Sequence, residues 1–568
     1  MNSKHSIRAR KIYPIIIICL VLILAFIIVA GIVTHPDVVS VSDEKYAGMH
    51  GALDEFTPTI KEDMNEIFSL TEATARNLSG VSMGDSSVEL ALLQLRRDIP
   101  ASYDTYIVDT NNTIQAITGT SEEQKPVGTQ SCANITEEDL KSSKNTSIVT
   151  SFYTCNDGKK GIIVIAPIYE ANGTFTGTIR VSLDTAYLFS GAVDQLRSDY
   201  GYTIWSIQQD GCLIYYEDTE LLGKNTLNNE IYTEESSFNV AQLVTEKPEG
   251  NISYVFYNVG WVEKGLINAV WDTISFPDGT EWRIVLTDDI SMNNIDTDNE
   301  HSSSQFTTSE LRTFVEKAYV YAQTHTKEEA LKAFNDRNGE FINGELYIFA
   351  YDINGTTLAL PYQTQLVGIN RLQAEDITGV KFVQREIART EQGGGYVYCQ
   401  YPNPAKGFAR ELKFAYVMPI NNNWFIGAGL YMDNTSFEPC GDMRNKMISQ
   451  VRNFQYLSKI MPEDELISML NNPNSSIQVD GLYPFASTYS GTILSYVMDP
   501  SVIGNNHLGY VNSYGMSIGR EAIPLAQSGG GLIYSLVWDP ELERDVYVLI
   551  YVEPVTEDTY YGSMIILE

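Results

Sequence analysis

Apolar and polar positions alternate along this chain with two different periods. Within residues 308–325 the apolar side chains recur every three or four positions, which predicts a helix with one buried face, and a second helix follows at 327–335. A short helix near 379–391 ends at consecutive glycines, Gly393–Gly395. Runs rich in β-branched and aromatic residues then predict three strands. These runs are residues 395–402, 411–420 and 424–431.

The first half of the chain shows the same change of period. Residues 44–97 are predicted to be largely helical, with breaks near Pro58 and Gly80. A strand–turn–strand pattern starts at 103–117, and a hairpin that turns at Asn172–Gly173 is predicted within 161–183.

One apolar run follows neither period. Ile15–Val33 has 19 residues and no charge, enough to cross a bilayer core as a helix. Four cationic residues precede it and acidic residues follow it. The positive-inside rule therefore predicts a cytoplasmic tail at 1–12, a transmembrane anchor at 13–34 and the bulk of the chain outside the membrane. The alternative is a cleaved signal peptide, although its apolar region is normally shorter.

A short motif, Gly-x-Asn-x-Leu, occurs three times, at Gly223/Asn225/Leu227, Gly368/Asn370/Leu372 and Gly504/Asn506/Leu508. The last two copies belong to a longer repeat with an offset of 136 residues, in which YIFAYDINGTTLALPYQTQLVGINRL from Tyr347 matches YPFASTYSGTILSYVMDPSVIGNNHL from Tyr483. A shared offset over so many positions indicates an internal duplication. Each copy predicts helices packed on one antiparallel sheet of about five strands, which is the α+β class.

Similarity to Cache domains is carried by ELYIFAYDINGTTLALPYQTQLVGINRL, GGGYVYCQYPNP and WFIGAGLYM, which resemble single Cache domains. The long N-terminal helix, the following strand module and a second module with DGCLIYYEDTELLGKN resemble a double Cache domain. Cache domains are PAS-like extracytoplasmic sensors of chemoreceptors and sensor kinases. The resemblance implies a double Cache domain at 45–295 (distal module about 98–190, proximal module about 198–290), a linker at 296–306, a single Cache domain at 307–432 and a second, divergent one at 433–568.

Charge and motif content exclude several functions. The sequence holds 38 Lys and Arg against 72 Asp and Glu, and its net charge of −34 repels nucleic acid. Zinc-type Cys or His pairs and Gly-rich phosphate loops are missing, so we expect no metal and no cofactor. Gly-x-Ser-x-Gly around Ser82 lacks the preceding strand of a hydrolase, so we expect no enzyme. Asp296, Asp298 and Glu300 suggest calcium, but a solvated linker is the preferred interpretation.

The resemblance also implies where a ligand binds, because a Cache pocket lies between the sheet and the layer that covers it. The candidates at 307–432 are Tyr347, Tyr351, Arg371, Tyr398 and Lys413. Arg371 and Lys413 together could hold a carboxylate. The alternative is that the tyrosines belong to the core and both cations to the surface. The last copy has His507 for Arg371, and Val548 or Leu549 for Lys413, so we expect no anion binding there.

In the distal module, Tyr153 matches a ligand position of the family's amino-acid binders. Cys155 and Ser182 stand where those binders carry carboxylates, so specificity for α-amino acids is not expected.

An outside location permits disulfides and glycosylation. Cys132 with Cys155 and Cys399 with Cys440 are candidate disulfides, which leaves Cys212 over; reduced, buried cysteines are the alternative. Nine Asn-x-Ser/Thr sequons are present, at Asn77, Asn111, Asn134, Asn145, Asn172, Asn251, Asn354, Asn434 and Asn474.

Together these patterns favour a membrane-anchored, extracytoplasmic protein that binds a small organic ligand, with a carboxylate as the favoured class. No signalling module follows the last predicted strand, so we expect the output to come from a separate receptor, kinase or transporter. The alternative is a structural or adhesive surface protein in which Cache modules act as spacers.

For the Gly-x-Asn-x-Leu motif we expect a role in folding. The glycine takes a backbone conformation that other residues resist, and the asparagine amide bonds the loop to main-chain groups. Asn370→Ala is then expected to lower stability by roughly 1–3 kcal/mol, whereas Arg371→Ala should change it by less than about 0.5 kcal/mol.

Overall fold

The computed structural model describes residues 43–119, 127–128, 135–154, 160–216, 221–227, 235–257, 264–289, 306–376, 378–406, 409–432, 440–512, 514, 516–540 and 542–567. The predicted tail and anchor, and the linker up to residue 305, lie outside these ranges. Within them, no helix combines the length and the apolar composition that a membrane crossing needs. The chain divides into two compact units, Met1–Gly48 and Met49–Glu568, and every contact given below lies within the second.

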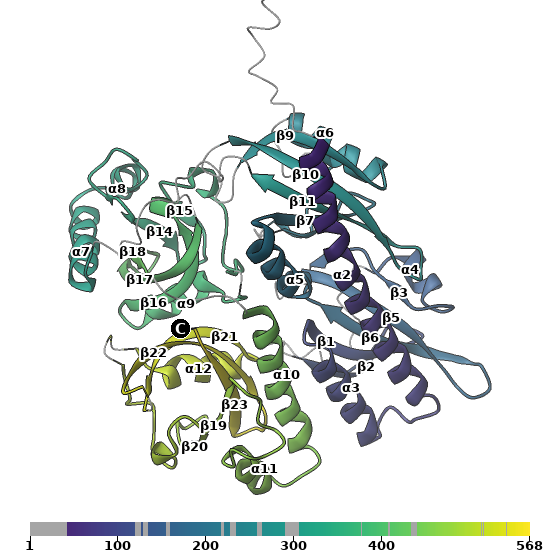
Figure 1. Cartoon of the computed structure of the whole chain (residues 1–568). Helices are drawn as coiled ribbons and strands as arrows, with labels where there is room; N and C mark the ends of the chain where they lie inside the picture. Colours follow the sequence, from purple (N-terminus) through teal and green to yellow (C-terminus); the bar gives the residue numbers. More distant parts are fainter. Residues whose placement is uncertain are drawn as a thin grey trace, which may run out of the picture. The chain divides into compact units, whose positions relative to one another are not determined.

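The described part of the second unit contains four antiparallel sheets with one strand order, together with a small two-stranded sheet (Figure 1). When the strands of each sheet are numbered in the order in which they follow along the chain, they lie side by side in the order 2-1-5-4-3. A short extra strand in the first sheet is left out of this numbering. The α+β class and the sheets of about five strands are therefore confirmed.

The first sheet and its helices cover the distal part of the predicted double Cache domain. The elements are α2 (Asp43–Asn77), α3 (Ser86–Asp98), β1 (Ser102–Asp109), β2 (Ile114–Gly119), α4 (Glu137–Ser142), β3 (Ile148–Val149), β4 (Tyr153–Thr154), β5 (Lys160–Tyr169), β6 (Phe175–Leu183) and α5 (Thr185–Tyr200). The break predicted at Pro58 is wrong, since α2 continues through it, with the Thr57 hydroxyl donating to the Leu53 carbonyl at 3.0 Å. The break near Gly80 is confirmed.

The second sheet follows α5 directly. Its elements are β7 (Thr203–Gln208), β8 (Leu213–Tyr215), α6 (Glu235–Glu246), β9 (Gly250–Tyr257), β10 (Lys264–Ser275) and β11 (Glu281–Asp289).

The third and fourth sheets belong to the duplicated units, which we call the middle module and the last module. The middle module contains α7 (Thr308–Thr324), α8 (Lys327–Phe334), β12 (Ile342–Asn343), β13 (Leu346–Tyr347), β14 (Phe349–Asp352), β15 (Thr357–Ala359), η3 (Thr364–Leu366), α9 (Phe382–Glu391), β16 (Gly395–Asn403), η4 (Pro404–Lys406), β17 (Ala409–Asn421) and β18 (Trp424–Tyr431). Helices α7 and α8 start where predicted because Thr307 and Thr326 close capping boxes with Glu310 and Glu329.

The last module repeats this plan. It contains α10 (Cys440–Ser458), α11 (Glu463–Leu470), β19 (Tyr483–Thr488), β20 (Ile493–Tyr496), η5 (Pro500–Val502), α12 (Ile518–Gln527), β21 (Gly531–Asp539), β22 (Arg544–Pro554) and β23 (Thr559–Ile566).

Each of these two sheets buries both faces. One face of each contributes to a shared hydrophobic core with α7, α8, α10 and α11, and we call it the helix face. The opposite face carries a separate cluster under α9 in the middle module and under α12 in the last module, and we call it the loop face. Strand side chains alternate between the two faces, so neighbours in a strand enter different cores.

Candidate functional site

The Gly-x-Asn-x-Leu motif forms one loop three times. In the middle module Gly368 has a φ of +88°, a conformation that favours glycine. The Asn370 amide donates to the Asn354 carbonyl at 2.7 Å, and its side-chain oxygen accepts the Leu372 N–H at 3.0 Å. The same pair of bonds is made by Asn225 and Asn506. The predicted loop geometry is confirmed, but Asn370 is exposed, so the stability cost that assumed a buried amide was set too high.

Arg371, next to the motif, points into the loop face of the middle module. Its guanidinium donates to the Tyr401 hydroxyl at 3.1 Å and the Tyr351 hydroxyl at 3.4 Å. The Lys413 ammonium donates to the Tyr347 hydroxyl at 2.9 Å. Arg371 is 8% exposed and Lys413 is 3% exposed, so the alternative in which both cations lie on the surface is wrong. We call these residues, together with Glu386, the cationic cluster.

Glu386 of α9 is the acidic member of this cluster. Burial raises the pKa of its carboxyl group to about 8, although Lys413 and Arg371 lower it. Burial likewise lowers the pKa of the Lys413 ammonium to about 8. The buried Oε2 of Glu386 has no hydrogen-bond partner among the described residues. Near neutral pH the cluster therefore carries more positive than negative charge. The Oε2 atom of Glu386 can still form a hydrogen bond with a ligand.

The structure separates the predicted ligand residues into two groups. Tyr347, Tyr351, Arg371 and Lys413 meet on the loop face, as a shared site requires. Tyr398 does not, because it lies on the helix face and packs on Tyr547 of the last module with ring centroids 5.7 Å apart. Its assignment to the ligand site is therefore wrong. Sequence reasoning missed Tyr401 and Tyr431, which occupy the loop face instead.

The last module carries none of these charges on its loop face. Val548 pairs with Ser535 in the sheet as Lys413 pairs with Cys399, and it is apolar. At the offset of 136 residues, His507 replaces Arg371 and Ala522 replaces Glu386. His507 bonds to the Ser487 hydroxyl at 2.9 Å, and burial lowers its pKa, which favours the neutral imidazole. A mainly apolar cavity of about 340 Å³ lies here, and we call it the apolar cavity.

The buried hydroxyl of Ser495 also lines the apolar cavity, and it has no hydrogen-bond partner among the described residues. The rim includes the exposed side chains of Tyr510 and Trp538. The side chains of Asp499 and Asp545 also line the cavity, so the lining suits an uncharged solute with a hydrogen-bonding group rather than an anion.

Two further predictions concern Tyr153 and the cysteines. Tyr153 is buried beside Ile148, Ile163 and Ile165, and its ligand role stays a prediction. Cys399 is a buried free thiol, so its predicted disulfide with Cys440 is wrong. The reason is its place on the loop face of β16, among the tyrosines of the cationic cluster. The other predicted pair, Cys132 and Cys155, lies outside the described residues, and Cys212 is buried.

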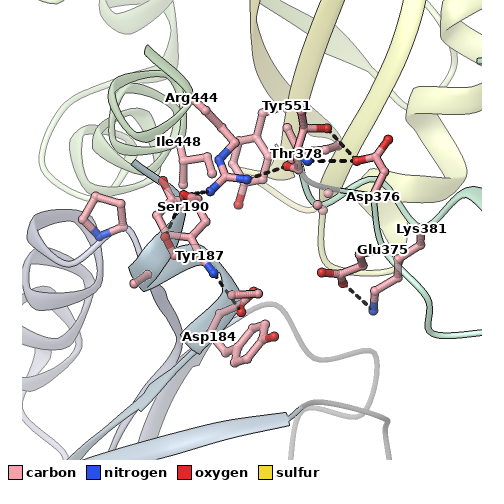
Figure 2. Close-up of a pocket in the computed structure, with 18 of the residues that line it drawn as sticks. Asp184, Tyr187, Ser190, Glu375, Asp376, Thr378, Lys381, Arg444, Ile448 and Tyr551 are labelled. Carbon is pink, nitrogen blue, oxygen red and sulfur yellow. Dashed lines mark hydrogen bonds and ion pairs between the residues drawn. The ribbon is translucent and has the colours of Figure 1, made fainter. Parts of the chain in front are cut away.

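A second cavity, of about 470 Å³, lies where α5, the loop that follows Arg371, and α10 meet, and we call it the junction cavity. Figure 2 shows its centre, with the Arg444 guanidinium between Ser190 and Thr378. Arg444 donates to the Thr378 carbonyl at 2.7 Å and stacks 4.2 Å from the Tyr187 ring centre. Glu375 faces Lys381 across 3.7 Å.

The comparisons with known proteins match part of the chain. Residues 309–438 match the family Single Cache domain 2. The sensor histidine kinase MctS of Rhizobium johnstonii is 30% identical over 89 residues, which is 16% of this chain and 19% of that protein. The chain thus spans about a fifth of the length of that relative.

Two solved structures are similar at low sequence identity. An extracellular ligand binding receptor from Desulfohalobium retbaense is 19% identical over 44% of this chain and 41% of its own, with a TM-score of 0.33. The ligand binding domain of the Pseudomonas aeruginosa amino acid chemoreceptor PctB, in complex with L-Arg, is 15% identical over 42% of this chain and 92% of its own, with a TM-score of 0.32.

The family match agrees with the Cache resemblance expected from the sequence, and it covers residues 309–438. The matched residues contain the whole cationic cluster.

Proposed function

We propose that this chain is a membrane-anchored, extracytoplasmic solute sensor whose middle module binds a small carboxylate. The observation that carries the proposal is the pair of buried cations, Arg371 and Lys413, which share one buried acid, Glu386. An isolated buried charge is costly, and a ligand carboxylate would offset the excess while bonding to both cations.

The proposed anchor is the apolar run Ile15–Val33. The surrounding tyrosines support a ligand role for the cluster. Tyr347, Tyr351 and Tyr401 present hydroxyl groups beside the two cations, and such groups orient a small polar solute without adding charge.

Thermal-shift screening of the purified full chain tests the proposal. Acetate, propionate and succinate should raise the unfolding temperature in a concentration-dependent way, because binding to the folded state stabilises it by mass action. Propanol serves as a probe of similar size to propionate that lacks the carboxylate. Stabilisation by none of the carboxylates at about 100 mM would leave the structural or adhesive function as the better reading.

A further inference from the structure

The junction cavity is separate from the loop faces of both modules. Its lining comes from α5, β8, the loop between Leu372 and Lys381, α10 and β22, segments that lie far apart in the sequence. The cationic cluster does not line it. It therefore needs its own chemical explanation.

Five cationic side chains line the junction cavity: Arg197, Lys381, Arg385, Arg444 and Arg452. Two of these arginines are committed to protein groups. Arg444 is held by Thr378 and Ser190, as described above. Arg452 donates to Glu553 at 3.2 Å and to the Ser102 carbonyl at 3.0 Å. These guanidiniums have well-placed acceptors, so they hold the modules together rather than attract an anion.

Three acidic side chains line the cavity. The Asp376 carboxylate accepts the N–H groups of Thr378, Val380 and Gln400. The other two acids, Asp184 and Glu375, come from different elements. Asp184 caps the N-terminus of α5 by accepting the Tyr187 N–H at 3.2 Å. Glu375, from the loop after the motif, lies on another side of the cavity in Figure 2. Glu375 also forms an ion pair with the partly exposed Lys381 at 3.7 Å.

Aromatic rings form a further part of the wall. Five tyrosines line the junction cavity: Tyr103, Tyr187, Tyr215, Tyr216 and Tyr551. Ring faces attract cations, most strongly where water is excluded. The cavity already shows this preference, because Tyr187 takes the Arg444 guanidinium on its face.

We propose that the junction cavity binds a small organic ammonium ion, with its nitrogen held between Asp184 and Glu375 and its carbon chain against the tyrosine rings. The volume of about 470 Å³ is within the range of small-molecule sites. The ligand of this second site is a cation, whereas the ligand proposed for the cationic cluster is an anion. The two sites use different residues.

The protonation of the two carboxyl groups agrees with this assignment. Burial raises the pKa of Glu375 to about 7, and the neighbouring Asp184 raises it further while Lys381 lowers it. Burial also raises the pKa of Asp184. A bound cation would relieve this repulsion, so amine affinity should rise as pH increases through about 7. The other titratable groups that line the cavity are Tyr103, Tyr187, Arg197, Tyr215, Tyr216, Asp376, Lys381, Arg385, Arg444, Arg452 and Tyr551, and Asp376 also raises the pKa of Glu375.

Calorimetric titration of the full chain with 1,4-diaminobutane and propylamine tests the proposal. Asp184→Asn keeps a good helix cap, and Glu375→Gln keeps the side-chain shape, so both remove charge alone. Each variant should weaken amine binding by more than about tenfold, because a charged hydrogen-bond partner is lost. Glu316→Gln, a change at an exposed acid of α7, is the matched control and should leave the affinity unchanged.

Crossing the two sites separates their failures. Arg371→Gln/Lys413→Met should keep amine binding, and Asp184→Asn/Glu375→Gln should keep the carboxylate-induced thermal shift. Absence of amine binding by the wild-type chain at about 10 mM, or full amine affinity in Asp184→Asn/Glu375→Gln, would overturn the proposal. The unfolding temperature of each variant without ligand shows that it is folded.

Discussion

The middle and last modules share one fold but keep their buried charges on opposite faces of the sheet. In the middle module the charges lie on the loop face, where Arg371, Lys413 and Glu386 meet. In the last module Val548 and Ala522 take the places of Lys413 and Glu386 on the loop face, and Glu553 lies on the helix face among Arg96 and Arg452. At the equivalent place in the middle module stands Met418, as the matching strand registers show.

The difference shows how a duplication separates two roles. The Glu553 carboxylate accepts hydrogen bonds from the two terminal guanidinium nitrogens of Arg96, at 2.8 and 3.0 Å. Arg96 belongs to α3, a helix that packs on the first sheet. Although burial alone would raise the pKa of Glu553, the two arginines hold it below its ordinary value. The last module thus uses its buried charge to attach to another module, whereas the buried charge of the middle module is the one that we propose binds a solute.

The largest expected effect concerns that attachment. Glu553→Gln should lower stability by about 3–5 kcal/mol, because removing one partner leaves buried arginines uncompensated. Urea unfolding of the full chain measures this loss. Met418→Leu, at the equivalent position of the middle module, should cost less than about 1.5 kcal/mol. Equal costs for the two variants would contradict the assignment of roles.

Arg371→Gln is expected to lower stability by about 1–3 kcal/mol, since it deprives two buried tyrosine hydroxyls of their donor. This loss of stability is larger than the change of less than about 0.5 kcal/mol that the sequence alone predicted for replacing Arg371. The exposed Arg312→Gln serves as the control in the same urea experiment. If both variants lose the same small amount, Arg371 is not part of a buried network.

Carboxylate affinity of the middle module should depend on pH. As pH rises through about 8, Glu386 loses a proton and becomes negative, and Lys413 loses its charge. Both changes make the net charge of the cluster less positive, so carboxylate affinity should fall by up to about tenfold per pH unit. Titration calorimetry with acetate between about pH 7 and pH 9 measures the trend. Affinity that stays constant or rises over this range would contradict the role of the cluster.

The smallest effect, and the one that should be equal in the two modules, comes from the motif. Asn370→Ala and Asn506→Ala should each cost about 0.5–1.5 kcal/mol, because each asparagine makes the same two bonds at an exposed site. Urea unfolding compares them. Loss of carboxylate binding in Asn370→Ala without loss of stability would mean that the motif serves the ligand rather than the fold.

Sequence patterns predicted the parts of this molecule that depend on local rules. The α7 helix begins at a capping box, and the motif loop needs a glycine and an amide at fixed spacing, so both could be predicted from residues alone. Tyr398 and Tyr401 show where this stops. Strand β16 is buried on both faces, so its pattern does not tell which tyrosine faces which core.

The rest of the site depends on contacts between distant segments. Glu386 looks like an ordinary polar residue of an amphipathic helix, and only packing of α9 on the sheet makes it a buried acid. The junction cavity joins residues as far apart as Tyr103 and Tyr551, which no local pattern links.

The most direct test of the central claim is calorimetric titration of the full chain with acetate, propionate and succinate. Wild-type protein should bind at least one of them, Arg371→Gln/Lys413→Met should lose more than about tenfold in affinity, and His507→Gln should bind as wild type does. Unchanged carboxylate binding in Arg371→Gln/Lys413→Met, with the variant shown to be folded, would contradict the account.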